Sequence, residues 1–181
     1  MTAIANEATA VRRAKGAGAA VSWTTCPSPI GDILLVADDS GLRELQLPGS
    51  FASRDDLSAS AAASASLAKT AEQLEAYFAG ELRTFELALA PKGTAFQLRV
   101  WKALTEIPYA QTESYGSVAA RIGNPKACRA VGMANNRNPL AILVPCHRVI
   151  GSTGSLVGYG GGLWMKEWLL RHEAEVAGRT A

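Results

Sequence analysis

The sequence is poor in the two residue types that most often build cross-links and metal sites. Its 181 residues include three cysteines and two histidines. The cysteines, Cys26, Cys128 and Cys146, are odd in number and widely spaced, which argues against a disulfide framework. No Cys-x-x-Cys pair occurs, and His147 and His172 are too few to complete a zinc site. We therefore expect no metal site and no cofactor.

Long hydrophobic runs are also missing, although 48% of the residues are hydrophobic. No apolar run reaches the length that spans a membrane. Residues 1–20 contain three basic side chains, but glycines interrupt the continuous apolar core that a secretory signal needs. We expect residues 1–20 to be a flexible tail of a cytoplasmic protein that has no membrane partner.

The net charge of +2 conceals an acidic part and a basic part of the chain. Residues 20–91 hold four basic and ten acidic side chains, and residues 92–148 hold eight basic and two acidic ones. A basic segment in a nearly neutral protein indicates either an anionic partner or an ordinary solvated face, and charge alone favours neither. The sign changes at Pro91-Lys92-Gly93, where we place the boundary between domains 21–91 and 92–181.

The N-terminal domain is predicted to be a small sheet with one helix. Residues 21–47 are typical of a β-meander. Residues 52–66 are rich in serine and alanine, which indicates a loop or a frayed helix start. Apolar residues recur at helical spacing over 67–78, with Gly80 as a plausible stop, and alternating apolar residues over 85–89 predict another strand.

The C-terminal domain is predicted to be mainly helical. Thr94 can cap a helix that ends near Ile107. A short helix over about 115–122, a stop at Gly123 and a second helix over 124–135, begun by Asn-Pro, make a helix-turn-helix candidate. Many helical hairpins bind nothing, but the basic surroundings of this one favour nucleic-acid binding. The fold class is therefore α+β, with a helix-turn-helix and an active-site strand or turn in the second domain.

The second helix of this pair has unusually small side chains. Ala127, Cys128, Ala130 and Gly132 surround Arg129. Small residues let a helix backbone approach a narrow groove, and one long cation among them can reach between base pairs. The alternative is a tight helix–helix contact with Arg129 in solvent, but the local charge favours binding in the minor groove of DNA.

The strongest sign of chemistry is the run Val144-Pro145-Cys146-His147-Arg148-Val149, which follows an apolar stretch at 142–144. A thiol attacks as its thiolate, so it needs a base. Adjacent side chains tend to diverge, so His147 would act on Cys146 through a bridging water, and Glu173 could orient the imidazole. The alternative, which an isolated Cys-His pair would favour, is a small buried cysteine beside an ordinary histidine.

Three further features accompany this run. Asn138-Pro139 precedes the apolar stretch, where an asparagine can pin one segment to another or simply lie in a loop. Residues 151–162 contain six glycines and Tyr159, so this loop either lets backbone approach a flat ligand or is a flexible connection. Tyr115 begins the first helix of the pair, where its hydroxyl could bond to a base, although an isolated tyrosine is more often a core aromatic.

Together these residues resemble the O6-alkylguanine-DNA alkyltransferases, the methylated-DNA–protein-cysteine methyltransferases. The resemblance is close over residues 93–173 and covers 21–91 only as a general arrangement. The matching stretches are Gly93-Thr94-Ala95-Phe96-Gln97, Val100-Trp101, Ile107-Pro108-Tyr109, Ser114-Tyr115-Gly116, Arg129-Ala130-Val131-Gly132, Asn138-Pro139, Val144 to Val149, Gly161-Gly162-Leu163 and Lys166-Glu167-Trp168-Leu169-Leu170.

The resemblance implies an RNase H-like N-terminal domain and a suicide reaction on double-stranded DNA that contains O6-alkylguanine. O6-methylguanine would be the main lesion, with O4-methylthymine a second candidate. The base would be flipped out of the duplex, and Cys146, activated by His147 and Glu173, would keep the alkyl group as a thioether. The other implied roles are a hinge asparagine at Asn138, base rotation by Tyr115, filling of the gap in the duplex by Arg129, DNA contacts by Ala127, Cys128, Ala130, Gly132 and Arg148, and a substrate pocket formed by Tyr159, Gly160, Val149, Met133 and Ala141. The protein would be a monomer, with cooperative assembly on DNA left open.

The sequence departs from the family pattern at a few positions. Cys128 stands where the family often has alanine, and Ala141 and Gly160 stand where some relatives have proline and serine. The last two positions lie near the alkyl pocket in the family, so we expect methyl transfer to be retained and large adducts such as benzyl groups to react slowly.

Three other functions remain open at this point. A non-catalytic alkylation sensor of the same fold would lack the reactive cysteine, which is present here. A cysteine hydrolase would use Cys146 and His147 but would not explain the basic segment or the small-residue helix. A DNA-binding regulator with a structural or redox-active cysteine would bind DNA without taking up an alkyl group.

Overall fold

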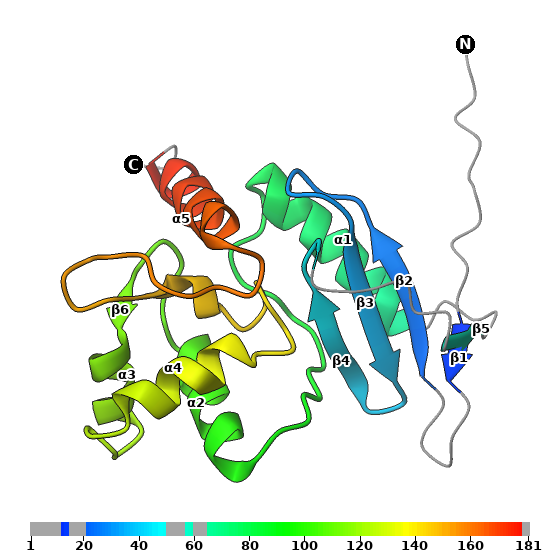
Figure 1. Cartoon of the computed structure of the whole chain (residues 1–181). Helices are drawn as coiled ribbons and strands as arrows, with labels where there is room; N and C mark the ends of the chain where they lie inside the picture. Colours follow the sequence, from blue (N-terminus) through cyan, green and yellow to red (C-terminus); the bar gives the residue numbers. More distant parts are fainter. Residues whose placement is uncertain (1–11, 15–20, 50–56, 60–64, 179–181) are drawn as a thin grey trace.

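The structure is a computed structural model that describes residues 12–14, 21–49, 57–59 and 65–178. A three-stranded antiparallel sheet with a helix against it forms the N-terminal part, and a cluster of helices forms the C-terminal part (Figure 1). The elements are β1 (Arg12–Ala14), β2 (Ser22–Cys26), β3 (Ile33–Asp38), β4 (Gly41–Gln46), β5 (Leu57–Ala59), α1 (Ala65–Ala79), α2 (Ala95–Thr105), β6 (Glu113–Ser114), α3 (Tyr115–Arg121), α4 (Cys128–Asn136), the 3₁₀ turn η1 (Cys146–Arg148), β7 (Val149–Ile150) and α5 (Leu163–Gly178). This arrangement confirms the predicted α+β class.

The predicted β-meander is confirmed, with strand order β2-β3-β4. The central strand β3 is buried from Ile33 to Ala37 and is paired along both edges. Ile33, Leu35 and Ala37 share one face and belong to the hydrophobic core, beside which α1 lies (Figure 1). Helix α1 ends at Gly80, which has φ 79° and so takes the left-handed conformation that favours glycine. A Cβ at Gly80 would lie 2.9 Å from Val176 of α5, so this turn is also a point of contact with the C-terminal helix.

Three predictions about secondary structure were wrong. Residues 12–14 are not part of a tail without structure but pair with 57–59, which lie in the predicted loop. The segment 85–89 forms no strand. Its backbone meets β4 only at Leu42, whose N–H donates to the Ala88 carbonyl at 2.8 Å and whose carbonyl accepts from Ala90 N–H at 2.8 Å. The alternation over 85–89 therefore reflects packing of one side of an extended segment.

Capping explains why two of the C-terminal helices begin where predicted and one does not. Thr94 and Gln97 form a reciprocal capping box at the start of α2, and the Ser114 hydroxyl accepts from Ser117 N–H at the start of α3. In contrast, 124–127 form a turn, and α4 begins only at Cys128 without a side-chain cap. The prediction that an Asn-Pro pair begins this helix was wrong, although the helix-turn-helix arrangement of α3 and α4 is present.

The two parts of the chain share one hydrophobic core. At the edge of the N-terminal sheet, Leu45 of β4 donates from its N–H to the carbonyl of Pro139 at 2.7 Å, and a parallel bridge joins Leu45 to Leu140. The N-terminal sheet therefore supports the segment that leads to Cys146. No helix in the described parts of the chain is long and apolar enough to cross a membrane.

Candidate active site

Cys146 begins the short turn η1 and has only 4% of its surface exposed. The apolar stretch before it, 142–144, is a buried turn, which is one of the two forms, strand or turn, that the sequence predicted for the active-site segment. Ile142 has φ 71°, a left-handed conformation that is unfavourable for a β-branched residue. This chain reversal places Cys146 at the junction of α4, the turn and β7, which pairs in parallel with β6 next to Tyr115.

Two asparagines fix this turn to the end of α4. The Asn138 side chain donates from Nδ2 to the Val144 carbonyl at 2.7 Å and accepts from Leu140 N–H at 3.0 Å. Asn138 thus bonds the segment that follows α4 to the active-site turn. Asn135, which the sequence analysis did not single out, is buried and donates from Nδ2 to the Cys146 carbonyl at 3.2 Å.

His147 and Glu173 meet although 26 residues separate them, and both side chains are fully buried. His147 Nε2 lies 2.8 Å from Glu173 Oε1. The carboxylate can only accept, so Nε2 carries the proton and the lone pair is on Nδ1. Nδ1 is buried and bonds to no other group in the described part of the protein. Burial lowers the pKa of His147, an effect that the nearby Glu173 partly offsets, so the imidazole is neutral at neutral pH.

Arg148 completes the network around Glu173. Its Nε lies 2.9 Å from Oε2, its second guanidinium nitrogen 2.9 Å from Oε1, and its third donates to the Ile107 carbonyl at 2.7 Å. Burial alone would raise the pKa of Glu173, but the bonds and charges of His147 and Arg148 hold it well below its usual range. Arg148 is 7% exposed. We assigned it a DNA contact, and the structure instead uses its guanidinium inside the protein.

The thiol of Cys146 lies in surroundings that oppose its ionisation while supplying groups that stabilise the anion. Burial raises the pKa of Cys146, and the Asn138 amide, the Lys166 ammonium and the Tyr159 hydroxyl act in the opposite direction. Lys166 is fully buried and donates from Nζ to the carbonyls of Val149 at 2.6 Å and Val157 at 3.0 Å. Burial of Lys166 could not be expected from the sequence, because a lysine on a helix is usually solvated.

The glycine-rich loop lies across this region. Tyr115 donates from its hydroxyl to the Val157 carbonyl at 3.1 Å, so the loop is tied to the start of α3. The Tyr159 hydroxyl is buried near Cys146, and burial raises its pKa well above the usual range, which keeps it a proton donor. Among the other predicted pocket residues, Val149 and Ala141 are buried, and Gly160 is exposed with open space around a Cβ.

The outer face of α4 is open to solvent. Cys128, Arg129 and Ala130 are exposed, and Ala127 and Gly132 are partly buried. Of the eight basic residues in 92–148, only Arg148 is buried, and the other seven are exposed. Met133 is 58% exposed and lines a shallow groove between α2 and α4 that contains neither Cys146 nor Tyr159. The structure therefore does not bring Met133 into the predicted pocket.

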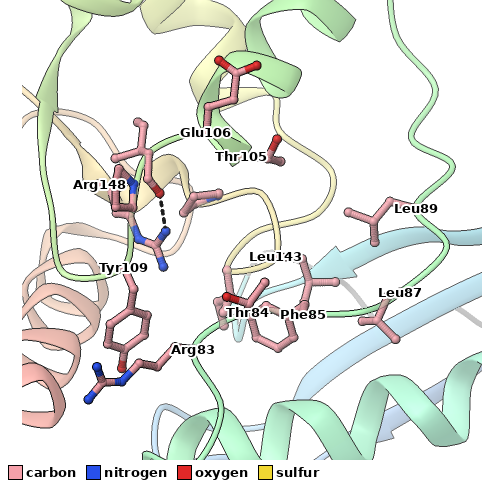
Figure 2. A pocket seen from close by; sticks show the side chains of 14 residues that line it. Arg83, Thr84, Phe85, Leu87, Leu89, Thr105, Glu106, Tyr109, Leu143 and Arg148 are labelled. Atoms are coloured by element: carbon pink, nitrogen blue, oxygen red, sulfur yellow. Dashed lines mark hydrogen bonds between the residues drawn. The ribbon is translucent and has the colours of Figure 1, made fainter. Parts of the chain in front are cut away.

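A cavity of about 380 Å³ lies behind the active-site turn, between 83–89 and the loop after α2 (Figure 2). Pro145 and Arg148 line it but Cys146 does not. Figure 2 shows Arg83 beside Tyr109, whose ring centre lies 5.6 Å from the guanidinium carbon. Within the described residues, no group of three histidine, cysteine, aspartate or glutamate side chains is placed to hold a metal ion.

Comparison with known proteins places this geometry in a family. The model described as 6-O-methylguanine DNA methyltransferase, DNA binding domain, matches residues 95–175, and the one for the ribonuclease-like domain of the same proteins matches residues 21–91. The methylated-DNA–protein-cysteine methyltransferase of Methanosarcina acetivorans is 52% identical over 155 residues, which cover 81% of this chain and 94% of that protein. The corresponding Mycobacterium tuberculosis protein is 47% identical over 168 residues, covering 84% and 92%.

Solved structures agree with these matches. A crystal structure of Mycobacterium tuberculosis OGT in complex with DNA has a TM-score of 0.76 and 47% identity, and covers 84% of this chain and 92% of that one. A structure of the O6-methylguanine methyltransferase of the same organism has a TM-score of 0.78 at 47% identity, covering 86% and 93%. The chain therefore belongs to the 6-O-methylguanine DNA methyltransferase family, the methylated-DNA–protein-cysteine methyltransferases.

Proposed function

We propose that this protein repairs DNA by moving an alkyl group, mainly methyl, from O6 of guanine to Cys146, with O4-methylthymine a second candidate substrate. The proposal rests mainly on a buried cysteine, Cys146, whose neighbour in sequence is His147. His147 is buried and bonds to Glu173, and the exposed helix α4, which has small side chains, lies next to this site. The Cys146 sulfur forms a bond to the alkyl carbon, and the bond from that carbon to O6 breaks. Its electron pair stays with O6, the guanine takes up a proton, and the thiol has lost one. A thioether has no easy leaving route, so each molecule reacts once.

His147 is proposed as the base for the thiol proton. Because Nε2–H is donated to Glu173, Nδ1 carries the lone pair and can accept the proton through a bridging water. Burial raises the pKa of Cys146 and lowers that of His147, so both are neutral in the resting site at neutral pH. The thiolate then forms as its proton moves to the imidazole, and Lys166 and Tyr159 stabilise the negative charge.

Helix α4 is proposed to lie in the minor groove of DNA. Its exposed Cys128 and Ala130, with Ala127 and Gly132 beside them, allow close approach of the backbone, and the exposed Arg129 can enter the base stack. Flipping the damaged base costs roughly a few kcal/mol, and Arg129 would offset part of this by filling the gap. Tyr115 would guide the rotating base; its half-buried ring and its bond to the Val157 carbonyl of the glycine-rich loop support this role.

The substrate pocket is proposed to form between the active-site turn and the glycine-rich loop. Tyr159, Gly160, Val149 and Ala141 would line it, and backbone groups at Cys146, Val149 and Gly160 would read the edge of the base. The Val149 carbonyl already accepts from Lys166, so Lys166 fixes the direction of this carbonyl. We further propose that the protein acts in the cytoplasm, because its three free cysteines suit a reducing compartment. We also propose that it acts as a monomer.

Intact-protein mass spectrometry with peptide mapping tests this proposal. After incubation with a duplex that carries one O6-methylguanine, we expect a gain of one methyl group on Cys146 that saturates at one per protein. Cys146→Ser should take up none while still binding DNA, and Cys26→Ser, which changes a thiol of the N-terminal sheet instead, should still gain one methyl group on Cys146. DNA binding by the wild type without methyl uptake would favour a non-catalytic sensor or regulator and overturn the proposal.

A further inference from the structure

The N-terminal domain supplies a hydrogen bond to the catalytic carboxylate, a role that the sequence gave no reason to expect. Tyr77 of α1 donates from its hydroxyl to Glu173 Oε1 at 2.9 Å, across 96 positions of sequence. Oε1 is the same oxygen that faces His147 Nε2 at 2.8 Å. The contact joins the N-terminal domain to the residue that orients the proposed base.

Tyr77 is held rigidly in this position. It is fully buried, and its ring meets those of Phe78, Phe85 and His172 at centroid distances of 5.3, 5.4 and 5.3 Å. His172 also donates from Nε2 to the Tyr77 carbonyl at 2.9 Å. Burial and the nearby Glu173 raise the pKa of Tyr77 well above its usual range, so the hydroxyl keeps its proton and acts as a donor. Packing alone would be satisfied by phenylalanine, so the hydroxyl is the part that requires explanation.

The donors to Glu173 differ in their own charge and in the carboxylate oxygen to which they bond. Five bonds reach the carboxylate: Tyr77, His147 and one guanidinium nitrogen of Arg148 at Oε1, and Arg148 Nε and Ala110 N–H at Oε2. Each donor stabilises the anion, so each lowers the strength with which the carboxylate attracts the proton on His147 Nε2. Tyr77 is a neutral donor that shares the oxygen with His147, so its removal acts on His147 most directly.

The other charged and titratable groups around this centre come from several elements. Tyr109, after α2, feels the charges of Glu173, Arg83 and Arg148 but bonds to none of them through its hydroxyl. Lys166 of α5 acts on His147 through its charge. Neither makes the direct bond to Glu173 that Tyr77 makes.

We propose that Tyr77 is a positioning residue of the N-terminal domain, which sets the basicity of His147 by sharing the Glu173 carboxylate with it. The inference rests on the proposed function, because His147 is taken as the base for Cys146. Without the hydroxyl, the carboxylate attracts the imidazole proton more strongly and the imidazolium becomes more stable. The acidic limb of the pH–rate profile then moves to higher pH, since a larger share of His147 is already protonated.

The test is Tyr77→Phe, which keeps the ring, compared with Tyr109→Phe as a matched control. Tyr109→Phe also removes a buried hydroxyl near Glu173, but one that donates to no group in the described structure. Two quantities are measured in each protein: the pKa of His147 by nitrogen NMR in the absence of DNA, and the single-turnover rate of methyl uptake between about pH 5 and 9. Completed uptake gives the active fraction, which corrects the rates for any misfolded protein.

For Tyr77→Phe we expect both the His147 pKa and the acidic limb to rise by about half to one unit. This is about half of the one to two units that a whole bond to a charged group is worth, because the bond from Tyr77 to Glu173 is present in both protonation states of His147. Tyr109→Phe should leave both in place. A lower active fraction at every pH with an unchanged His147 pKa would reduce Tyr77 to a packing residue and overturn the proposal. Should wild-type protein take up no methyl group, the proposed function fails, while the NMR comparison still decides the role of Tyr77.

If Tyr77→Phe does not fold, the role of Tyr77 can be tested by proton NMR of the wild-type protein. The proposal requires a slowly exchanging Tyr77 hydroxyl proton with a nuclear Overhauser contact to the His147 Nε2 proton. The lack of such a signal, in spectra where the His147 Nε2 proton itself is seen, would overturn it.

Discussion

Replacing Glu173 by glutamine removes the charge at the centre of the buried network but keeps the shape of the side chain. An amide has one oxygen and one NH₂ group, so its nitrogen must face one of two donor sets. At Oε1 these are Tyr77, His147 and Arg148, and at Oε2 they are Arg148 and the Ala110 N–H. Either orientation opposes donors to donors. The guanidinium of Arg148, 7% exposed, also loses its counter-charge.

The expected cost follows from that uncompensated charge. Removing one partner of a buried ion pair destabilises a protein by about 3–5 kcal/mol, against a total stability of about 5–15 kcal/mol for a typical domain. For a chain of this size, the midpoint of thermal unfolding should fall by roughly 6–20 °C. Methyl transfer by the protein that remains folded should slow by about 100-fold or more, because the base loses the group that orients it.

Two separate assays test this: urea denaturation measures the free energy of unfolding, and single-turnover methyl uptake by the folded protein measures the rate. Two further variants are compared with Glu173→Gln. Glu175→Gln also neutralises an acid of α5, but its carboxylate is exposed and lies 3.9 Å from Arg171, so it should cost less than about 0.5 kcal/mol. Glu173→Gln combined with Arg148→Met removes both charges and should recover part of the lost stability without restoring the rate. The reasoning is refuted if Glu173→Gln costs less than about 1 kcal/mol, a loss no larger than that of an ordinary neutral hydrogen bond.

Three other outcomes follow from the same contacts. The pKa values of His147 and Glu173 are both lower in the folded protein than in the unfolded chain, so in acid the unfolded chain binds more protons. The free energy of unfolding should therefore be highest above about pH 6.5. It should decrease as the pH falls below that value because of His147, and decrease further below about pH 4.3 because of Glu173. Urea midpoints across pH measure this, and a flat profile between pH 4 and 7 would contradict it. Asn138→Ala removes both bonds that hold the active-site turn and should cost about 2–3 kcal/mol and most of the activity. Asn138→Asp keeps the acceptor for Leu140 N–H but sets a carboxylate oxygen against the Val144 carbonyl, so it should cost at least as much stability as Asn138→Ala; a clearly smaller loss would show that the bond to Val144 is unimportant. Rates on O6-benzylguanine should be well below those on O6-methylguanine, and Gly160→Ser, which has open space for its side chain, should narrow the gap; equal wild-type rates on the two adducts would reject this view of the pocket.

The sequence by itself determined the elements whose causes are local. The helical spacing up to Phe78, the glycine stop at Gly80 and the Thr94 capping box act over a few residues, so they can be read directly from neighbouring positions. The run around Cys146 likewise identified the candidate nucleophile and its neighbour, because a thiol next to an imidazole suggests nucleophilic chemistry whatever the fold of the protein. Glu173 and Asn138 were candidates from the sequence, the family resemblance gave each of them one role, and the structure shows the contacts from Glu173 to His147 and from Asn138 to Val144.

Only the tertiary structure decided whether the long charged side chains are buried and which groups they bond to. Arg148 and Lys166 are charged, and a sequence gives such residues a solvated surface by default, yet here both are buried on partners that come from distant segments. The apolar run that contains Ile142 left a strand and a turn equally open, because burial requires apolar residues in a turn as much as in a sheet. Tyr77 shows the limit most clearly. Its partner lies 96 residues away, and no local pattern encodes a contact that exists only when two domains pack together.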